Sequence, residues 1–211
     1  MVVSVDSSTT RFVIGLVPIL FFASLWLAIV AFLRTEKKKT PVYLLFFTIF
    51  YIYLFKVLDY TLLQFQSLLL VQHFVPNLMV KGVAAPESIN LMPLVTLTGE
   101  DLRTSLLNIL LMMPFGFGLP FITDYSFRRI VLTGVLFSVA IELLQLLTGL
   151  AAGMTFRIAD INDVIFNSIG AAMGYLLFIG FMHIYLYISH KWELPPNSIL
   201  QYIAERPQID K

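Results

Sequence analysis

Seven polar side chains stand within or beside long apolar stretches of this sequence, and they are the residues best suited to chemistry. A charged side chain near the middle of a membrane-length apolar helix costs at least about 2.5–3.5 kcal/mol, so such residues favour a functional interpretation. The candidate acid–base pair is Glu142 and Asp163. The candidate ligand-binding residues are Asn108, Gln145, Arg157, Asp160 and Asn167.

The spacing of these residues predicts that they share helix faces. Asp160, Asp163 and Asn167 follow one another at intervals of three and four residues, which is the period of one face of an α-helix. Glu142 and Gln145 show the same interval in the preceding apolar stretch. We therefore expect the polar residues of two consecutive helices to converge.

Depth is a second indication that the polar residues form one cluster. A helix rises about 1.5 Å per residue. By this measure, Asn108, Glu142 and Asn167 each lie roughly 6 to 12 Å from the end of their span that faces the same side of the membrane. Arg157 belongs to the loop between two of these helices, from which it can reach down to the acids. This arrangement predicts a polar site in the outer half of the membrane.

Two acids beside one arginine could bind a ligand or transfer protons. Glu142 and Asp163 would serve as general acid and base, and Glu142 is the better candidate for holding a proton because it lies deeper. The chain has no cysteine, and no serine stands in a recognisable nucleophile arrangement, so a covalent mechanism has little support. The histidines lack the spacing of a metal site. We expect neither a metal nor another cofactor, and the sequence does not decide whether the protein is an enzyme.

Helix packing accounts for the presence of some small and polar residues at least as well as a functional role does. Small residues recur at the spacing of a tight helix–helix contact, and we interpret them as packing residues: Gly134, Ser138, Gly170 and Gly174. Hydrogen bonds between helices would account for the three amide side chains as well as ligand binding does. The acids and the arginine favour function more strongly, since a structural ion pair needs one acid only.

The elements that must position these residues are membrane-spanning helices. Hydrophobic residues make up 58 % of the chain, charged residues only 13 %, and the mean hydropathy is +0.85. A soluble domain has about one quarter charged residues. The apolar residues form blocks of the roughly 17–25 residues that a bilayer requires. We predict an all-α, polytopic transmembrane helical bundle with about five spans: Phe12–Leu33, Tyr43–Leu58, Thr104–Ile122, Ile130–Leu150 and Ile161–Ile188.

These spans divide the chain into four parts. Residues 1–60 form an N-terminal hairpin of two spans, residues 104–188 form a three-helix core, and residues 189–211 form a cytoplasmic tail. Residues 61–103 are interpreted as an extracytoplasmic segment, amphipathic or re-entrant, in which Asn90 and Pro93 would shape a cap over the polar site. The sequence leaves open whether residues 61–80 cross, line or lie on the membrane.

The distribution of basic residues predicts the orientation. Nine of the fourteen Lys and Arg residues fall on one side of such a bundle, and the positive-inside rule assigns that side to the cytoplasm. The N-terminus then lies outside, the C-terminus lies inside and the polar site faces outward. A net charge of +1 gives no strongly basic surface, so no nucleic-acid partner is expected.

Four motifs in the second half of the chain resemble the VanZ-like family. They are Ile89-Asn-Leu-Met-Pro-Leu94, the Asn108…Pro114-x-Gly116 pattern, Glu142-x-x-Gln145, and Arg157-x-x-Asp160-x-x-Asp163-x-x-x-Asn167. The similarity covers about Ile89 to Leu177. The family is named for a protein of glycopeptide-resistance gene clusters and is associated with resistance to teicoplanin. The resemblance implies a multi-pass protein of the bacterial cytoplasmic membrane connected with the cell envelope, with the seven candidates as its characteristic polar residues.

Three hypotheses about function follow. The leading one is an outer-leaflet polar site that engages the polar part of an amphiphile, so that a membrane lipid or a lipid-tailed ligand is the expected partner and apolar walls accept its acyl chain. One alternative is a small proton-coupled transporter or flippase with Glu142 as its proton carrier. The other is a structural or assembly protein in which the cluster only locks three helices together. The oligomeric state is left open.

Overall fold

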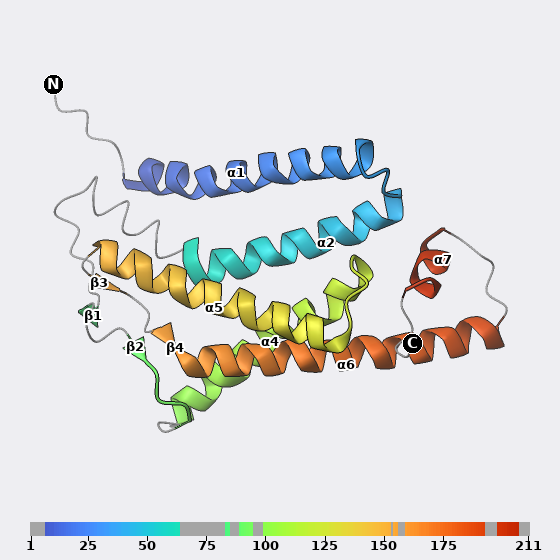
Figure 1. Cartoon of the computed structure of the whole chain (residues 1–211). Helices are drawn as coiled ribbons and strands as arrows, with labels where there is room; N and C mark the ends of the chain where they lie inside the picture. Colours follow the sequence, from blue (N-terminus) through green and yellow to red (C-terminus); the bar gives the residue numbers. More distant parts are fainter. Residues whose placement is uncertain are drawn as a thin grey trace.

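The computed structural model is a bundle of long helices (Figure 1), and it describes residues 7–63, 83–84, 89–94, 99–152, 154–155, 159–192 and 198–206. Among these residues, five helices are long and apolar enough to cross a membrane, which confirms the predicted all-α fold with five spans. The five helices are α1 (Ser7–Thr35), α2 (Pro41–Leu58), α4 (Gly99–Gly118), α5 (Phe127–Ala152) and α6 (Ile161–Lys191).

Short elements complete the described chain. A π-helical turn, η1 (Asp59–Leu63), prolongs α2, a 3-10 turn, η3 (Leu119–Phe121), ends α4, and the short helix α7 (Ser198–Ala204) follows α6. Two-residue strands pair in two places: β1 (Val83–Ala84) runs antiparallel to β3 (Met154–Thr155), and β2 (Ile89–Asn90) runs parallel to β4 (Ala159–Asp160). Most of the predicted segment 61–103 lies outside the described residues, and of residues 61–80 only 61–63, within η1, are described.

The most extensive contact between two described helices is that of α4 with α6, and glycines make it possible. A Cβ atom at Gly174 would overlap the carbonyl oxygen of Met113, and one at Gly116 would overlap the carbonyl oxygen of Ala171. The two backbones therefore touch directly, as small residues allow in membranes. The expected packing role of Gly170 and Gly174 thus has α4 as its partner, and this contact fixes how the polar residues of the two helices face each other.

Helix α1 packs beside α2 at the edge of the bundle (Figure 1). The Tyr51 hydroxyl donates a hydrogen bond to the Phe22 carbonyl oxygen at 2.8 Å, and the Trp26 indole N–H donates to the Thr48 hydroxyl at 3.1 Å. No residue of the apolar span Leu16–Thr35 is buried within the protein. A helix that is apolar on all sides and exposed along its length is stable only with lipid around it.

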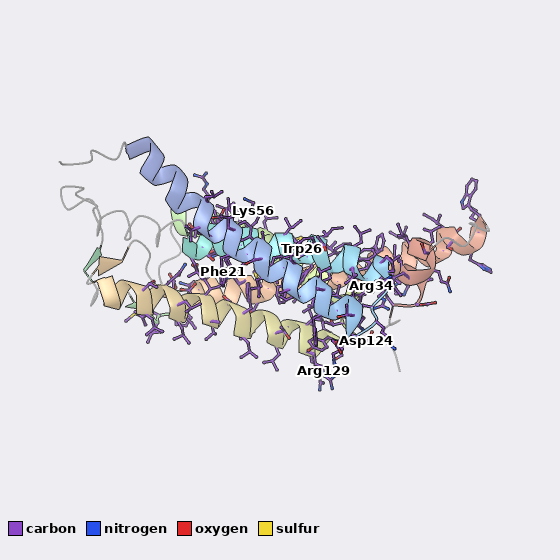
Figure 2. All side chains as sticks on the ribbon, turned by 90° about the horizontal axis from the view of Figure 1, so that it is seen from above. Phe21, Trp26, Arg34, Lys56, Asp124 and Arg129 are labelled. Atoms are coloured by element: carbon purple, nitrogen blue, oxygen red, sulfur yellow. The ribbon has the colours of Figure 1, made fainter. Side chains whose placement is uncertain are left out.

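The two ends of the bundle differ in charge. We call the end with η1 and β1–β4 the polar end, and the end with the α1–α2 turn, η3 and α7 the α7 end (Figure 1). Figure 2 shows Arg34, Asp124 and Arg129 close to the α7 end and Lys56 towards the polar end. Eight described basic residues lie at the α7 end: Arg34, Lys37, Lys38, Lys39, Arg128, Arg129, Lys191 and Arg206. By the positive-inside rule, the α7 end is expected to be cytoplasmic.

Helix α7, within the predicted tail, folds back onto the bundle. The Tyr202 hydroxyl donates a hydrogen bond to the Phe121 carbonyl oxygen, and the Tyr202 ring stacks on Phe46 of α2 with 5.4 Å between centroids. Burial raises the pKa of the Tyr202 phenol above its ordinary value of 10.0, so the hydroxyl stays protonated and able to donate at neutral pH. The Tyr185 hydroxyl of α6 also donates to the Leu200 carbonyl oxygen at 2.7 Å. The tail therefore closes the α7 end of the bundle.

Candidate functional site

The candidate site lies at the polar end, where β4 leads into α6. Asp160 is the N-cap of α6, and its Oδ1 accepts a hydrogen bond from the Asn162 backbone N–H at 2.8 Å. A carboxylate is a preferred N-cap because it satisfies a free N–H group and lies at the positive end of the helix dipole. The chain therefore passes from strand β4 to helix α6 at Asp160, one of the predicted ligand-binding residues.

The segment 89–94 crosses the start of α6 and covers part of this site. Asn90 pairs with Asp160 in the β2–β4 ladder, and its Nδ2 donates a hydrogen bond to Asp160 Oδ2 at 3.1 Å. The Leu94 backbone N–H donates to Asn162 Oδ1 at 2.8 Å. Asn90 and Leu94 thus bond the described part of this segment to the start of α6, with Pro93 in the turn between them, and the re-entrant cap stays a prediction.

Glu142 joins α5 to the same junction. Its Oε2 accepts a hydrogen bond from the Asp160 backbone N–H at 3.1 Å, and only 8 % of the residue is exposed. Asp160 itself is half-buried. The buried acid is therefore held by a backbone donor beside a helix N-terminus, where negative charge is stabilised.

Asp163 and Asn108 form the next contact, between α6 and α4. The Asn108 Nδ2 donates to Asp163 Oδ1 at 2.6 Å, and Asn108 is buried while Asp163 is half-buried. A carboxylate accepts several hydrogen bonds, and Asn108 supplies one of those made to Asp163. Asp160 and Asp163 are thus two acids, one turn apart and both open to their surroundings in part.

Asn167 and Ser138 lie one helical turn below Asp163. The Asn167 Nδ2 donates to Ser138 Oγ at 2.8 Å, linking α6 to α5, and both residues are buried. Asn167 Oδ1 is buried and has no hydrogen-bond partner among the described residues. A polar strip therefore runs down between α4, α5 and α6, from the half-buried acids to this pair.

Gln145 faces a different neighbour. Its Nε2 donates to the Thr61 carbonyl oxygen at 2.8 Å, in the π-helical turn that prolongs α2. Gln145 is buried, and this bond connects α5 to α2. The structure thus gives Gln145 an inter-helix contact at one side of the cluster.

The predicted residues are therefore only partly brought together. Five of them share the polar strip and its junction: Asn108, Glu142, Asp160, Asp163 and Asn167. Arg157 lies outside the described residues, so its expected contact with the acids stays a prediction. Sequence reasoning missed Asn162, although an amide two residues after an N-cap acid and one before Asp163 was a visible signal.

Two cavities in the part of the chain that the structure describes lie away from the polar end. A cavity of about 330 Å³ lies between α2, α4, α6 and α7, and one of about 270 Å³ lies between α1 and α2. Neither is lined by any of the seven predicted residues. Exposed apolar side chains lie close in sequence to Asn90, Asn108 and Glu142: Leu91, Met92, Leu94, Leu107, Leu143 and Leu144. An amphiphile could place its polar part on the acids and its tail against these residues.

Among the residues that the structure describes, no group of three or more His, Cys, Asp or Glu side chains could hold a metal ion. The carboxylates and amides of the polar strip instead offer acceptors and donors of hydrogen bonds, and the buried and half-buried acids could exchange protons.

A family model described as VanZ/LLP1 matches residues 13–184. The match confirms the resemblance and extends it from residues 89–177 to the first two spans. No curated protein and no solved structure matches the chain.

Proposed function

We propose, from the premise that this chain belongs to the VanZ/LLP1 family, that it contributes to resistance against glycopeptide antibiotics, teicoplanin in particular, in the bacterial cytoplasmic membrane. Family membership suggests a membrane protein linked to glycopeptide resistance. The finer proposal is that the polar end faces the outer leaflet and engages the polar part of an amphiphile, such as a lipid-tailed antibiotic or an envelope lipid.

One observation carries this proposal: two half-buried acids, Asp160 and Asp163, lie one turn apart at a helix N-terminus beside the buried Glu142. Partial exposure leaves the carboxylates of Asp160 and Asp163 within reach of a ligand at this end of the bundle. Acids left partly open at the end of an apolar bundle suit a ligand with hydroxyl or amine donors.

The apolar surroundings suggest which ligands would be distinguished. Teicoplanin carries an acyl tail and vancomycin does not. The exposed Leu107 of α4 and Leu143 of α5 would contact such a tail while the acids hold the polar part. Arg157, by its place in the sequence, would bring a positive charge to the same ligand. If a bond is broken in the ligand, Glu142 and Asp163 are the acid and base.

The two alternatives differ from this proposal in what the cluster does. A transporter or flippase would be expected to have acids along a path to the other side of the membrane. The halves of α4, α5 and α6 nearer the α7 end contain no Asp or Glu: none follows Asn108 in α4, none precedes Glu142 in α5 and none follows Asp163 in α6. For a scaffold, the hydrogen bonds of Asn108 and Asn167 between helices would be the whole role of the cluster.

Drug susceptibility of a Gram-positive host is the test. Wild type, Glu142→Gln and Asp163→Asn would be expressed and their abundance in the membrane measured. We expect wild type to protect against teicoplanin more than against vancomycin, and both variants to lose that protection at equal abundance, because neither amide can accept as a carboxylate does.

Asp59→Asn is the matched control. Asp59 is a partly exposed acid at the same end of the bundle, 3.6 Å from Lys56, and it is outside the polar strip. The Asp59→Asn variant should protect against teicoplanin as wild type does. Protection by Glu142→Gln and Asp163→Asn equal to that of wild type would contradict the site. Loss of protection in proportion to loss of folded protein would favour the scaffold.

A further inference from the structure

An apolar groove lies at the opposite end of the bundle from the candidate site. The cavity of about 330 Å³ is bordered by α2, α4 and α6, and Ile203 of α7 contributes to its wall. Its lining is almost wholly apolar and rich in aromatic rings, among them Phe46, Phe50 and Phe121. Ile49 of α2 also lines it and is 57 % exposed, so the groove opens to the membrane around the protein.

A cation stands at the α7 end of this groove. The guanidinium carbon of Arg206 lies 4.3 Å from the centroid of the Tyr202 ring, and Arg206 Nη1 donates to the carbonyl oxygen of Phe121, whose ring lines the groove. The Tyr202 ring in turn stacks on Phe46, another lining residue. Arg206 therefore contacts Phe121, which lines the groove, and Tyr202, which packs against another lining residue.

The acid that faces Arg206 neutralises it only weakly. Asp124 Oδ1 lies 3.9 Å from Arg206 Nη1, and the Asp124 side chain is 84 % exposed. The Arg206 side chain is only 16 % exposed, so Asp124 is the exposed partner, and water and salt around Asp124 weaken the attraction at this distance. Arg206 Nε is buried and has no hydrogen-bond partner among the described residues. Because Nε is buried, an anion would bind Arg206 through the exposed part of its side chain.

The charge around the groove favours an anion over a neutral group. The described residues at the α7 end include eight basic residues against three acids, Glu36, Asp124 and Glu205. Basic residues beside transmembrane helices attract anionic lipid headgroups, and a guanidinium matches the geometry of a phosphate. A groove of apolar rings open to the bilayer accepts a hydrocarbon chain at little cost.

We propose that this groove binds an anionic phospholipid, with one acyl chain along Phe46, Ile49 and Phe121 and the phosphate on Arg206. The site is separate from the polar end, and it would exist whichever ligand the acids take. A bound lipid would also connect α7 to the spans, since Arg206 and Ile203 both belong to the tail that covers this end.

The test is lipid retention by the full chain, purified in a mild detergent and examined by native mass spectrometry. Dioleoyl phosphatidylglycerol and dioleoyl phosphatidylcholine would be added at equal concentrations. We expect wild type to retain phosphatidylglycerol about fivefold better, the factor that one basic residue near a headgroup supplies. Arg206→Gln should lower this ratio towards one, and Arg206→Lys should restore part of it.

Two further variants test the groove itself. Ile49→Trp fills it from an exposed position, so the fold should survive, and bound phosphatidylglycerol should fall. Leu45→Trp is the matched control on α2, since Leu45 is 47 % exposed and is not a lining residue. Arg129→Gln controls for charge at the same end.

The outcomes separate the possibilities. Equal retention of the two lipids by wild type would overturn the proposal and leave only unspecific lipid contact. A preference that survives both Arg206→Gln and Ile49→Trp would also overturn it, because the anionic lipid would then bind elsewhere. If Arg206→Gln does not fold, the retention of phosphatidylglycerol by Ile49→Trp compared with that by Leu45→Trp still tests whether the lipid occupies the groove. None of these results depends on antibiotic protection, so the proposed function stands or falls separately.

Discussion

At the scale of single residues, the buried Ser138–Asn167 pair raises the question of whether every polar residue of the strip contacts a ligand. The pair is buried one turn below the half-buried acids, and one amide atom of Asn167 is without a partner among the described residues. Such a contact joins α5 to α6 whether or not a ligand binds. We therefore interpret it as structural, and the acids above it as the ligand-facing groups.

Substitution of this pair should show the asymmetry of buried hydrogen bonds. Ser138→Ala alone leaves the Asn167 N–H group buried and unpaired, which should lower the free energy of unfolding by about 1–3 kcal/mol. The double variant Ser138→Ala/Asn167→Leu removes both partners and should recover most of that loss. Thermal unfolding in detergent measures both, and a double variant less stable than the single one would contradict the interpretation.

Residue spacing predicted that polar side chains of neighbouring helices converge, which five of the seven candidates do, but it did not predict how they bond. The three- and four-residue intervals brought Asp163 towards Asn108 and Asn167 towards α5, as the structure has them. They could not show that Glu142 binds the backbone of Asp160, or that Asn162 bonds to segment 89–94. The Asn162 bond depends on segment 89–94 and the Glu142 bond on β4, and β2 and β4 are paired across a long stretch of sequence.

At the scale of elements, the packing of α4 on α6 positions Asn108 against Asp163. The glycines of this contact leave room for the facing backbone only, so the two helices have one register in which they fit. A shift of either helix by one residue would turn Asn108 away from the acid. The contact therefore supports both the stability and the geometry of the candidate site.

Gly174→Ala should disrupt this contact, because the added methyl group would overlap the carbonyl oxygen of Met113. The expected cost is about 1–3 kcal/mol or more, as for overpacking of a tight core. Gly180→Ala on the same helix is the matched control, since nothing lies within 4 Å of its added Cβ. Thermal unfolding of both in detergent is the measurement, and equal stability of the two variants would show that α4 and α6 are not in direct contact.

The helices were largely predictable from sequence and the short elements were not. Lengths of apolar blocks predicted all five spans, and the Gly170–Gly174 spacing indicated a packing face without identifying its partner. Helix α7 and the turn η1 carry no long apolar period. Their positions depend on contacts such as Tyr202 with Phe121 and Gln145 with Thr61, which form only in the assembled bundle.

At the scale of the whole molecule, the two ends of the bundle have different chemistry. Acids and amides gather at the polar end, while basic residues and the apolar groove lie at the α7 end. Counting basic residues along the sequence predicts this asymmetry, because alternate loops of a helical bundle return to the same side. The orientation of the bundle then decides which leaflet each site meets.

Cysteine labelling can determine that orientation, and the chain suits it because it contains no cysteine of its own. Met92→Cys places a thiol in the exposed segment of the polar end, and Lys37→Cys and Tyr125→Cys place one in exposed turns at the α7 end. A membrane-impermeant maleimide should label Met92→Cys in intact cells. It should label the other two only after the membrane is made permeable, since basic loops are retained in the cytoplasm.

The unmodified chain supplies the background in this experiment. The reverse labelling pattern would place Glu142, Asp160 and Asp163 in the cytoplasmic half, where an antibiotic acting outside could not reach them. The outer-leaflet site would then be wrong, while the groove beside Arg206 would face lipids of the outer leaflet and keep its preference for an anion. Labelling of all three variants in intact cells would mean that the chain inserts in both orientations, and the positive-inside argument would fail for this protein.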